Sequence, residues 1–454
     1  MHLILDILYK SIKQNHMNTI SCIKRNKLLI RFISYISLWY GYVMFMAKNS
    51  YLGVNWLEFH TSRIENAVNH ILTQSDFTKF GITSWTDIGN NSRDIIYSVQ
   101  AHEYLHYTFL MKIGGFELLN KYGPLLDKLI IFVLCSITAE LCIYLLKNKS
   151  NIFNYMIGIW SFLIIATLPY TYRMFLSLWQ DVYMLAFTML SYYLFSKNKK
   201  YLGFTVLIYA LMWQYHWALL LGFYYLFIRF YYLLTSSKKF DLYPPGFRNC
   251  KSSTIFTLCI FISPLITTIQ TLAIKISNIT LLNNSFLYRV GIDSIKNIHH
   301  GGIIAGLQFL GGNRLSLCLK PPGFIDQIIT NQLELNIYKF NCITAITGMI
   351  VISIIGIIGY IIFISSQNDS LWITLPLPIT FFIFTLIFQQ AMAAHLQGHS
   401  IFFAPILTFG IINLVTSIPK INNNHPISLI CCSTLIAGII INNIKVSYLT
   451  GVNG

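Results

Sequence analysis

Residues 341–364 read NCITAITGMIVISIIGIIGYIIFI and contain no charged residue. A helix needs about 20 consecutive apolar residues to cross the hydrocarbon core of a bilayer, so this run is long enough to span one. Similar runs recur along the whole chain, of which only 11% is charged. Soluble domains carry about 25% charged residues. The alternation typical of membrane β-barrels is absent, so the sequence predicts an all-α polytopic membrane protein.

The apolar runs predict about eleven transmembrane helices. One long apolar stretch is divided into two spans at Trp213–His216. The predicted spans are residues 28–47, 128–146, 153–170, 174–196, 201–215, 216–236, 253–275, 341–364, 370–389, 400–418 and 426–444.

The placement of lysine and arginine predicts the orientation, because cytoplasmic segments carry an excess of both. Residues 1–27 are basic, lack the apolar core of a signal peptide, and are expected in the cytoplasm. The loops at 48–127 and 276–340 mix both signs of charge and fall outside. We therefore expect a membrane core over residues 28–275, a second external loop at 276–340, and further membrane helices over 341–454. The net charge of +16 follows mainly from this topology, and no basic soluble face predicts nucleic-acid binding.

The cysteines fall into groups by their expected position. Cys318 and Cys342 are expected on or near the external side, where they could pair. Cys22 and Cys250 are expected in the cytoplasm. The cysteines inside apolar spans behave as small hydrophobic residues; these are Cys135, Cys142, Cys259, Cys431 and Cys432.

The first external loop opens with WLEFHTSRIENAVN at residues 56–69. On a helix, Leu57 and Ile64 lie on one face and Glu58 lies on another, which predicts an amphipathic helix at the membrane interface. A plain surface helix with solvated carboxylates is the alternative.

Three short motifs together resemble the GT-C glycosyltransferases, which include protein O-mannosyltransferases and lipid A aminoarabinose transferases. Glu58 and Arg63 follow the first membrane helix, as an acid and an arginine do in that fold, although the family usually has Asp. His102–Tyr107, leading to Gly114-Gly115, resembles the entry to the family's second interfacial helix without its prolines. Pro169–Arg173 followed by Asp181 resembles a third motif. The resemblance covers roughly residues 28–240 in organisation.

The resemblance implies a transferase that takes a sugar from a polyprenyl phosphate on the external face of a bacterial inner membrane. The acceptor, a lipid, glycan or protein hydroxyl, must lose its proton, and Glu58 is the expected base. The leaving phosphate gathers charge that Arg63 would neutralise. Asp181 would support the catalytic site. Metal dependence varies within the fold, and we predict no metal or other cofactor.

Polar residues in apolar surroundings mark further candidates for substrate binding. Asp181 stands near the outer end of its span, where a charge is costly without a partner or a role, and Arg173 is a candidate partner. A structural ion pair or a protonated, packed acid explains Asp181 equally. His216 lies among aromatic residues that also fit an interfacial belt, and His395 and His399 fall at another outer helix end.

Two rival functions stay open. His102 and His106 belong to a His-Glu-x-x-His motif, which on a helix could bind zinc with Glu103 as the base of a membrane protease. A third ligand at a convincing spacing is missing, since neither Glu117 nor Glu140 fits. A transporter or flippase for a lipid-linked sugar explains a buried Asp181 but not the long first loop.

Overall fold

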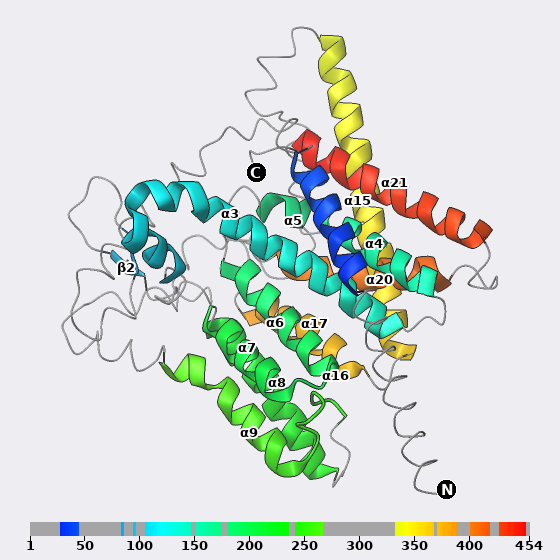
Figure 1. Cartoon of the computed structure of the whole chain (residues 1–454). Coiled ribbons are helices and arrows are strands. Elements are labelled where there is room, and N and C mark those ends of the chain that lie inside the picture. The colour runs from blue at the N-terminus through cyan, green and yellow to red at the C-terminus, as the bar shows by residue number, and fades with distance from the viewer. Residues whose placement is uncertain are drawn as a thin grey trace, which may run out of the picture.

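The structure is a computed structural model whose described residues are almost all helical, with one short strand pair among them (Figure 1). It describes residues 28–44, 83–85, 94–96, 105–146, 151–174, 180–213, 215–235, 241–266, 332–366, 370–387, 400–417 and 426–450. Strands β1 (Thr83–Trp85) and β2 (Asp94–Ile96) pair in antiparallel fashion. This small ribbon lies inside the predicted first external loop, and the predicted all-α class is confirmed by the helices that make up nearly all of the described residues.

Each predicted span overlaps a helix over most of its length except the span 253–275, of which α9 covers the first part and residues 267–275 lie outside the described ranges. The first helix covers Leu28–Met44. The other helices are α3 (Leu105–Leu146), α4 (Asn151–Thr167), α5 (Pro169–Met174), α6 (Gln180–Ser196), α7 (Lys200–Met212), α8 (Tyr215–Leu234), α9 (Cys250–Ile260), α15 (Gln332–Ser366), α16 (Leu371–Thr374), α17 (Pro376–Ile387), η4 (Ser400–Phe402), α20 (Phe403–Ser417) and α21 (Pro426–Thr450).

Among the described residues, four helices are long and apolar enough to cross a membrane: Lys128–Leu146, His216–Leu234, Gln332–Ser366 and Ile427–Ser447. Shorter apolar helices occupy six further segments, the first helix among them. The chain therefore has the helices of an integral membrane protein. The predicted division at Trp213–His216 is confirmed, because α7 ends at Met212 and α8 begins at Tyr215.

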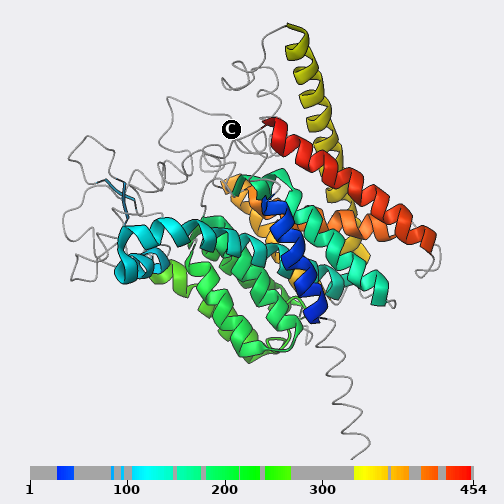
Figure 2. The same cartoon turned by 45° about the horizontal axis from the view of Figure 1, so that its top comes forward.

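Several boundaries differ from the predicted ones. Within the predicted span 174–196, α6 begins at Gln180, and the short helix α5 starts at Pro169, a residue that suits the first turn of a helix. Helix α15 begins at Gln332, inside the segment expected to form the second external loop. With 35 residues it is about 52 Å long, which exceeds a hydrocarbon core of about 30 Å. Figure 2 shows one end of α15 extending beyond the other helices.

Helix α3 begins inside the predicted first external loop and bends at two glycines. Gly114 has φ −136° and ψ 17°, and Gly115 has φ 65°, a left-handed conformation that favours glycine. Phe109 and Ile113 on the first segment are exposed. A helical segment before the bend agrees with the expected second interfacial helix, whereas the expected helix at 56–69 lies outside the described residues.

Close packing joins α15 to α20. A Cβ atom built on Gly410 would overlap the carbonyl oxygen of Gly356, and one built on Gly359 would overlap the carbonyl oxygen of Gly410. The side chain of Asn413 also donates to the carbonyl of Gly359 at 3.1 Å. Small residues let helix backbones approach closely, as is common between membrane helices.

Helix α21 lies alongside α15, as Figures 1 and 2 both show. Asn442 donates to the carbonyl of Ala345 at 3.2 Å, and the hydroxyl of Tyr338 donates to the carbonyl of Leu449 at 2.8 Å. Near this contact, Cys342 is buried and forms a disulfide bond. Hydrogen bonds therefore join α15 and α21 at two places, Ala345–Asn442 and Tyr338–Leu449.

Candidate functional site

Two of the predicted site residues have described side chains. Asp181 lies in the first turn of α6 and is 0% exposed, and His216 lies in the first turn of α8 and is 2% exposed. The backbone of Arg173 belongs to α5, but its side chain lies outside the described residues, so its predicted pairing with Asp181 is untested. The remaining predicted site residues lie outside the described ranges: Glu58, Arg63, His102, His395 and His399.

Aromatic stacking brings the beginnings of α6 and α8 to the same end of the bundle. Tyr183, two residues after Asp181, stacks on Trp213 with ring centroids 4.3 Å apart. Trp213 is the C-cap residue of α7, and α8 starts with Tyr215 and His216. Asp181 therefore lies in the first turn of a helix that stacks on the end of α7, and His216 lies in the first turn of α8, three residues after Trp213.

A second aromatic group contains Trp217, the residue that follows His216 in α8. Trp217 stacks on Phe402 with centroids 3.9 Å apart and on Phe384 with centroids 4.8 Å apart. Phe402 belongs to η4, which packs against α5, α6 and α17. Helices α5, α6 and α17 thus contact η4, α8 reaches it through Trp217, and Asp181 of α6 and His216 of α8 are both buried.

Polar atoms in this region include two that sequence reasoning did not single out. The Thr171 hydroxyl on α5 and the Trp217 indole nitrogen are buried and have no hydrogen-bond partner among the described residues. Polar groups without partners are costly in an apolar interior. Thr171 lies within the quoted motif Pro169–Arg173, but a single hydroxyl in a helix carries no periodic signal.

The electrostatics at the end of α6 favour a negative charge. Asp181 is the acidic residue in the first turn of α6, where the helix dipole and the backbone N–H groups stabilise an anion. A buried carboxylate there can accept hydrogen bonds from a hydroxyl group, and a neighbouring imidazole can donate or accept a proton. The two side chains have the chemistry needed to hold a hydroxylic substrate.

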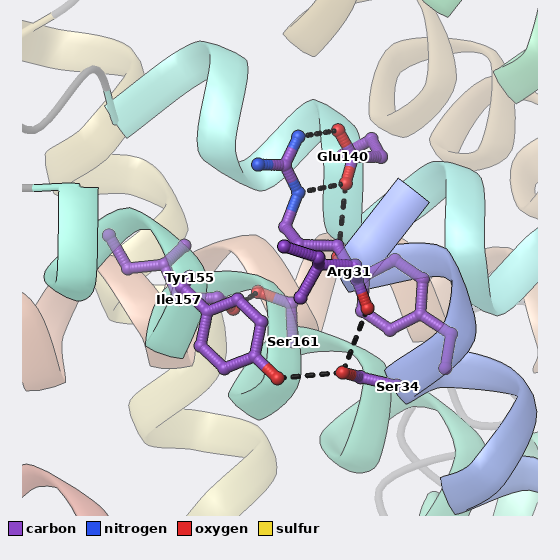
Figure 3. A network of polar contacts seen from close by, with 8 residues as sticks. Arg31, Ser34, Glu140, Tyr155, Ile157 and Ser161 are labelled. Carbon is purple, nitrogen blue, oxygen red and sulfur yellow. Dashed lines mark hydrogen bonds and ion pairs between the residues drawn. The ribbon is translucent and has the colours of Figure 1, made fainter. Parts of the chain in front are cut away.

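A second polar cluster lies elsewhere and was not predicted. Arg31 of the first helix donates from Nε and Nη2 to Glu140 of α3, at 2.7 Å to Oε1 and 2.8 Å to Oε2 (Figure 3). The Tyr35 hydroxyl donates to the same carboxylate at 3.1 Å. Ser34 and Tyr155 of α4 share a hydrogen bond of 2.6 Å beside this pair. The available sequence signal was an acid inside an apolar span, which usually has a partner.

The zinc motif cannot be assembled from the described residues. His102 and Glu103 lie outside them, and α3 begins at Leu105, so that only the backbone of His106 is described. Within the described ranges, no group of three histidine, cysteine, aspartate or glutamate side chains is arranged to hold a metal ion. The motif stays a prediction from the sequence.

Comparison with protein-family models, with curated proteins and with solved structures finds no match to this chain. The resemblance to the GT-C glycosyltransferases therefore stays a prediction from the quoted motifs. Support for a function comes from the residues of the chain and from their arrangement.

Proposed function

We propose that this chain is a GT-C-like membrane glycosyltransferase that moves a sugar from a polyprenyl phosphate to an acceptor hydroxyl on the external face. The observation that carries the proposal is the fully buried Asp181, which shares one end of the helix bundle with His216. Buried ionisable groups in a membrane helix are costly and usually serve a substrate or an ion. In the predicted topology of about eleven spans, this end faces outward, on the side of the long first loop.

The proposed reaction needs a base and a stabilised leaving group. The acceptor oxygen forms a bond to the anomeric carbon and gives its proton to Glu58. The bond between the anomeric carbon and the phosphate oxygen breaks, and the polyprenyl phosphate leaves with the electron pair. Arg63 neutralises the charge that develops on this phosphate. Asp181 and His216 hold hydroxyl groups of the sugar or the acceptor in position.

The predicted orientation has independent support from Cys342. Disulfide bonds persist in oxidising compartments and are rare in the cytosol. Cys342 is disulfide-bonded and lies in the first part of α15, which the predicted topology assigns to the external side. The bond agrees with an external position for this end of α15.

The proposal is tested by measuring release of polyprenyl phosphate from a panel of polyprenyl-phosphate sugars, with the purified chain in lipid nanodiscs. We expect turnover that falls at least about 100-fold in Glu58→Gln, the scale of general-base catalysis, and that also falls in Asp181→Asn. Asp241→Asn is a matched control, because Asp241 is exposed in the segment between α8 and α9. It should keep full activity.

The same preparations distinguish the rival functions. Stoichiometric zinc that is lost in His102→Ala, with no release of polyprenyl phosphate, would replace the transferase with a protease. Movement of the lipid-linked sugar between leaflets, with its glycosidic bond intact, would replace it with a flippase. Equal turnover in Glu58→Gln and in the wild type would remove Glu58 as the base.

A further inference from the structure

The guanidinium group of Arg31 has an unused hydrogen-bonding edge. Arginine carries five N–H donors, and Arg31 uses one on Nε and one on Nη2 for Glu140. These two donors lie on the edge of the guanidinium group formed by Nε and Nη2, called the side-on fork. The end-on fork, made by Nη1 and the second hydrogen of Nη2, has no acceptor among the described residues. Figure 3 shows the third guanidinium nitrogen pointing away from the Glu140 carboxylate.

This edge lies next to an exposed apolar surface on the first helix. The Arg31 side chain is 17% exposed, whereas Glu140 is only 8% exposed. The neighbouring Ile30, Phe32 and Ile33 are all exposed, as expected for a helix face in contact with acyl chains. A partner for the free fork can therefore reach it from outside the protein.

Arg31 lies in the first turn of the first helix, near its predicted cytoplasmic end. Glu140 precedes the end of α3 at Leu146 by six residues, which corresponds to about 9 Å along the helix. Side chains on a helix tilt toward its amino terminus, so Arg31 reaches from its helix toward the nearer membrane surface. Long basic side chains at such positions place their charged end at the interface.

A phosphate group matches what this edge requires. Two phosphate oxygens can accept from the two nitrogens of a guanidinium fork, a geometry that lysine cannot reproduce. The negative charge of Glu140 is already shared by Arg31 and Tyr35, so it opposes a second anion less strongly. In the sequence, Lys24, Arg25 and Lys27 precede Arg31 closely, and such basic segments attract anionic headgroups.

We infer that Arg31 binds the headgroup phosphate of an anionic phospholipid through its free fork while its other edge holds Glu140. The lipid then links the first helix to α3 and α4 at the cytoplasmic interface. This site is separate from the proposed transferase site, and the inference stands if the chain has another function.

The experiment measures thermal unfolding of the full chain in mild detergent while phosphatidylglycerol is added. Diacylglycerol, which lacks the phosphate, and inorganic phosphate, which lacks the acyl chains, are the two comparison probes. We expect phosphatidylglycerol to raise the melting temperature in a saturable way and neither comparison probe to do so. A rise of the same size with diacylglycerol or with inorganic phosphate would overturn the inference.

Substitutions then assign the effect to Arg31. Arg31→Lys keeps a charge to pair with Glu140 but has no fork, so the apparent affinity for phosphatidylglycerol should fall about tenfold or more. Arg248→Lys, a control outside the predicted spans, should leave the affinity unchanged. Unchanged affinity in Arg31→Lys would overturn the inference.

Glu140→Gln provides a second variant that keeps the lipid-binding residue. Removing the competing carboxylate leaves Arg31 with more unpaired charge, so the affinity for phosphatidylglycerol should stay equal or rise. If Arg31 served only the ion pair, Glu140→Gln would unfold more easily and gain nothing from the lipid. That outcome would also reject the phosphate site, even if Arg31→Lys failed to fold.

Discussion

Gly410→Ala should strongly destabilise the bundle, because α15 and α20 touch through their backbones. The added Cβ would lie 2.8 Å from the amide nitrogen of Tyr360 and would overlap the carbonyl oxygen of Gly356. Both neighbours are backbone atoms, so no side-chain rotation relieves the overlap, and the helices must separate.

The size of the effect follows from three contributions. Overpacking costs about 3 kcal/mol at the upper end of its usual range, which suits a clash with backbone. Separation of the helices also weakens the hydrogen bond from Asn413 to Gly359, worth about 1 kcal/mol. Alanine regains about 1 kcal/mol through its better helix propensity. We therefore expect a net loss of about 3 kcal/mol in the free energy of unfolding.

The assay is equilibrium unfolding in mixed micelles of mild detergent and SDS, followed by circular dichroism. Gly438→Ala is the matched control, because a Cβ built on this helical glycine of α21 meets nothing within 4 Å. It should be neutral or stabilising by up to about 1 kcal/mol. Gly359→Ala should resemble Gly410→Ala, and the double variant should cost less than the sum, since both separate the same helices. Equal stability of Gly410→Ala and Gly438→Ala would refute the backbone contact.

Three further predictions concern other parts of the chain. Asn443 is buried and its amide has no partner among the described residues, so Asn443→Leu should keep or raise stability by about 1 kcal/mol in the same assay; a clear loss would mean that the amide is paired. Mass spectrometry under non-reducing conditions should recover a peptide pair that joins Cys342 to Cys318, and a bond to Cys22 would contradict the predicted topology. Burial raises the pKa of Tyr243 from 10.0 to about 12. The neutral phenol therefore contributes stability that is complete below pH 10 and is lost as the pH rises to 12. Melting curves should show a smaller loss over that interval for Tyr243→Phe, and identical curves would contradict a buried neutral phenol.

The positions of the helices could be predicted because hydropathy is a local property of the sequence. The break at Trp213–His216 was predictable for the same reason, since polar and aromatic residues interrupt one apolar run. Hydropathy does not detect helix that continues outside the apolar run. The start of α15 at Gln332 was therefore assigned to the second external loop, and the first segment of α3 was expected as an interfacial helix only from the resemblance, not from hydropathy.

Side-chain partners across the bundle could not be predicted in the same way. Arg31 and Glu140 are 109 residues apart, and neither carries a local pattern that names the other. In the sequence, Arg31 reads as one more basic residue near the cytoplasm. Asp181 and His216 were found because each is a polar residue in an apolar span. Their common position depends on the stack of Tyr183 on Trp213, which only the fold reveals.

The separation of Arg31 from Glu140 has a consequence for the synthesis of the chain. Ribosomes add about 5 to 20 residues per second, so the 109 residues between them take about 5 to 20 s to appear. During this interval the first helix carries an arginine whose carboxylate partner has not yet been made. Insertion of that helix must then rely on the translocation machinery or on surrounding headgroups. The ion pair with Glu140 forms only after α3 has been synthesised. The synthesis of Arg31 and that of Glu140 are thus separated in time by the whole of the predicted first external loop, residues 48–127.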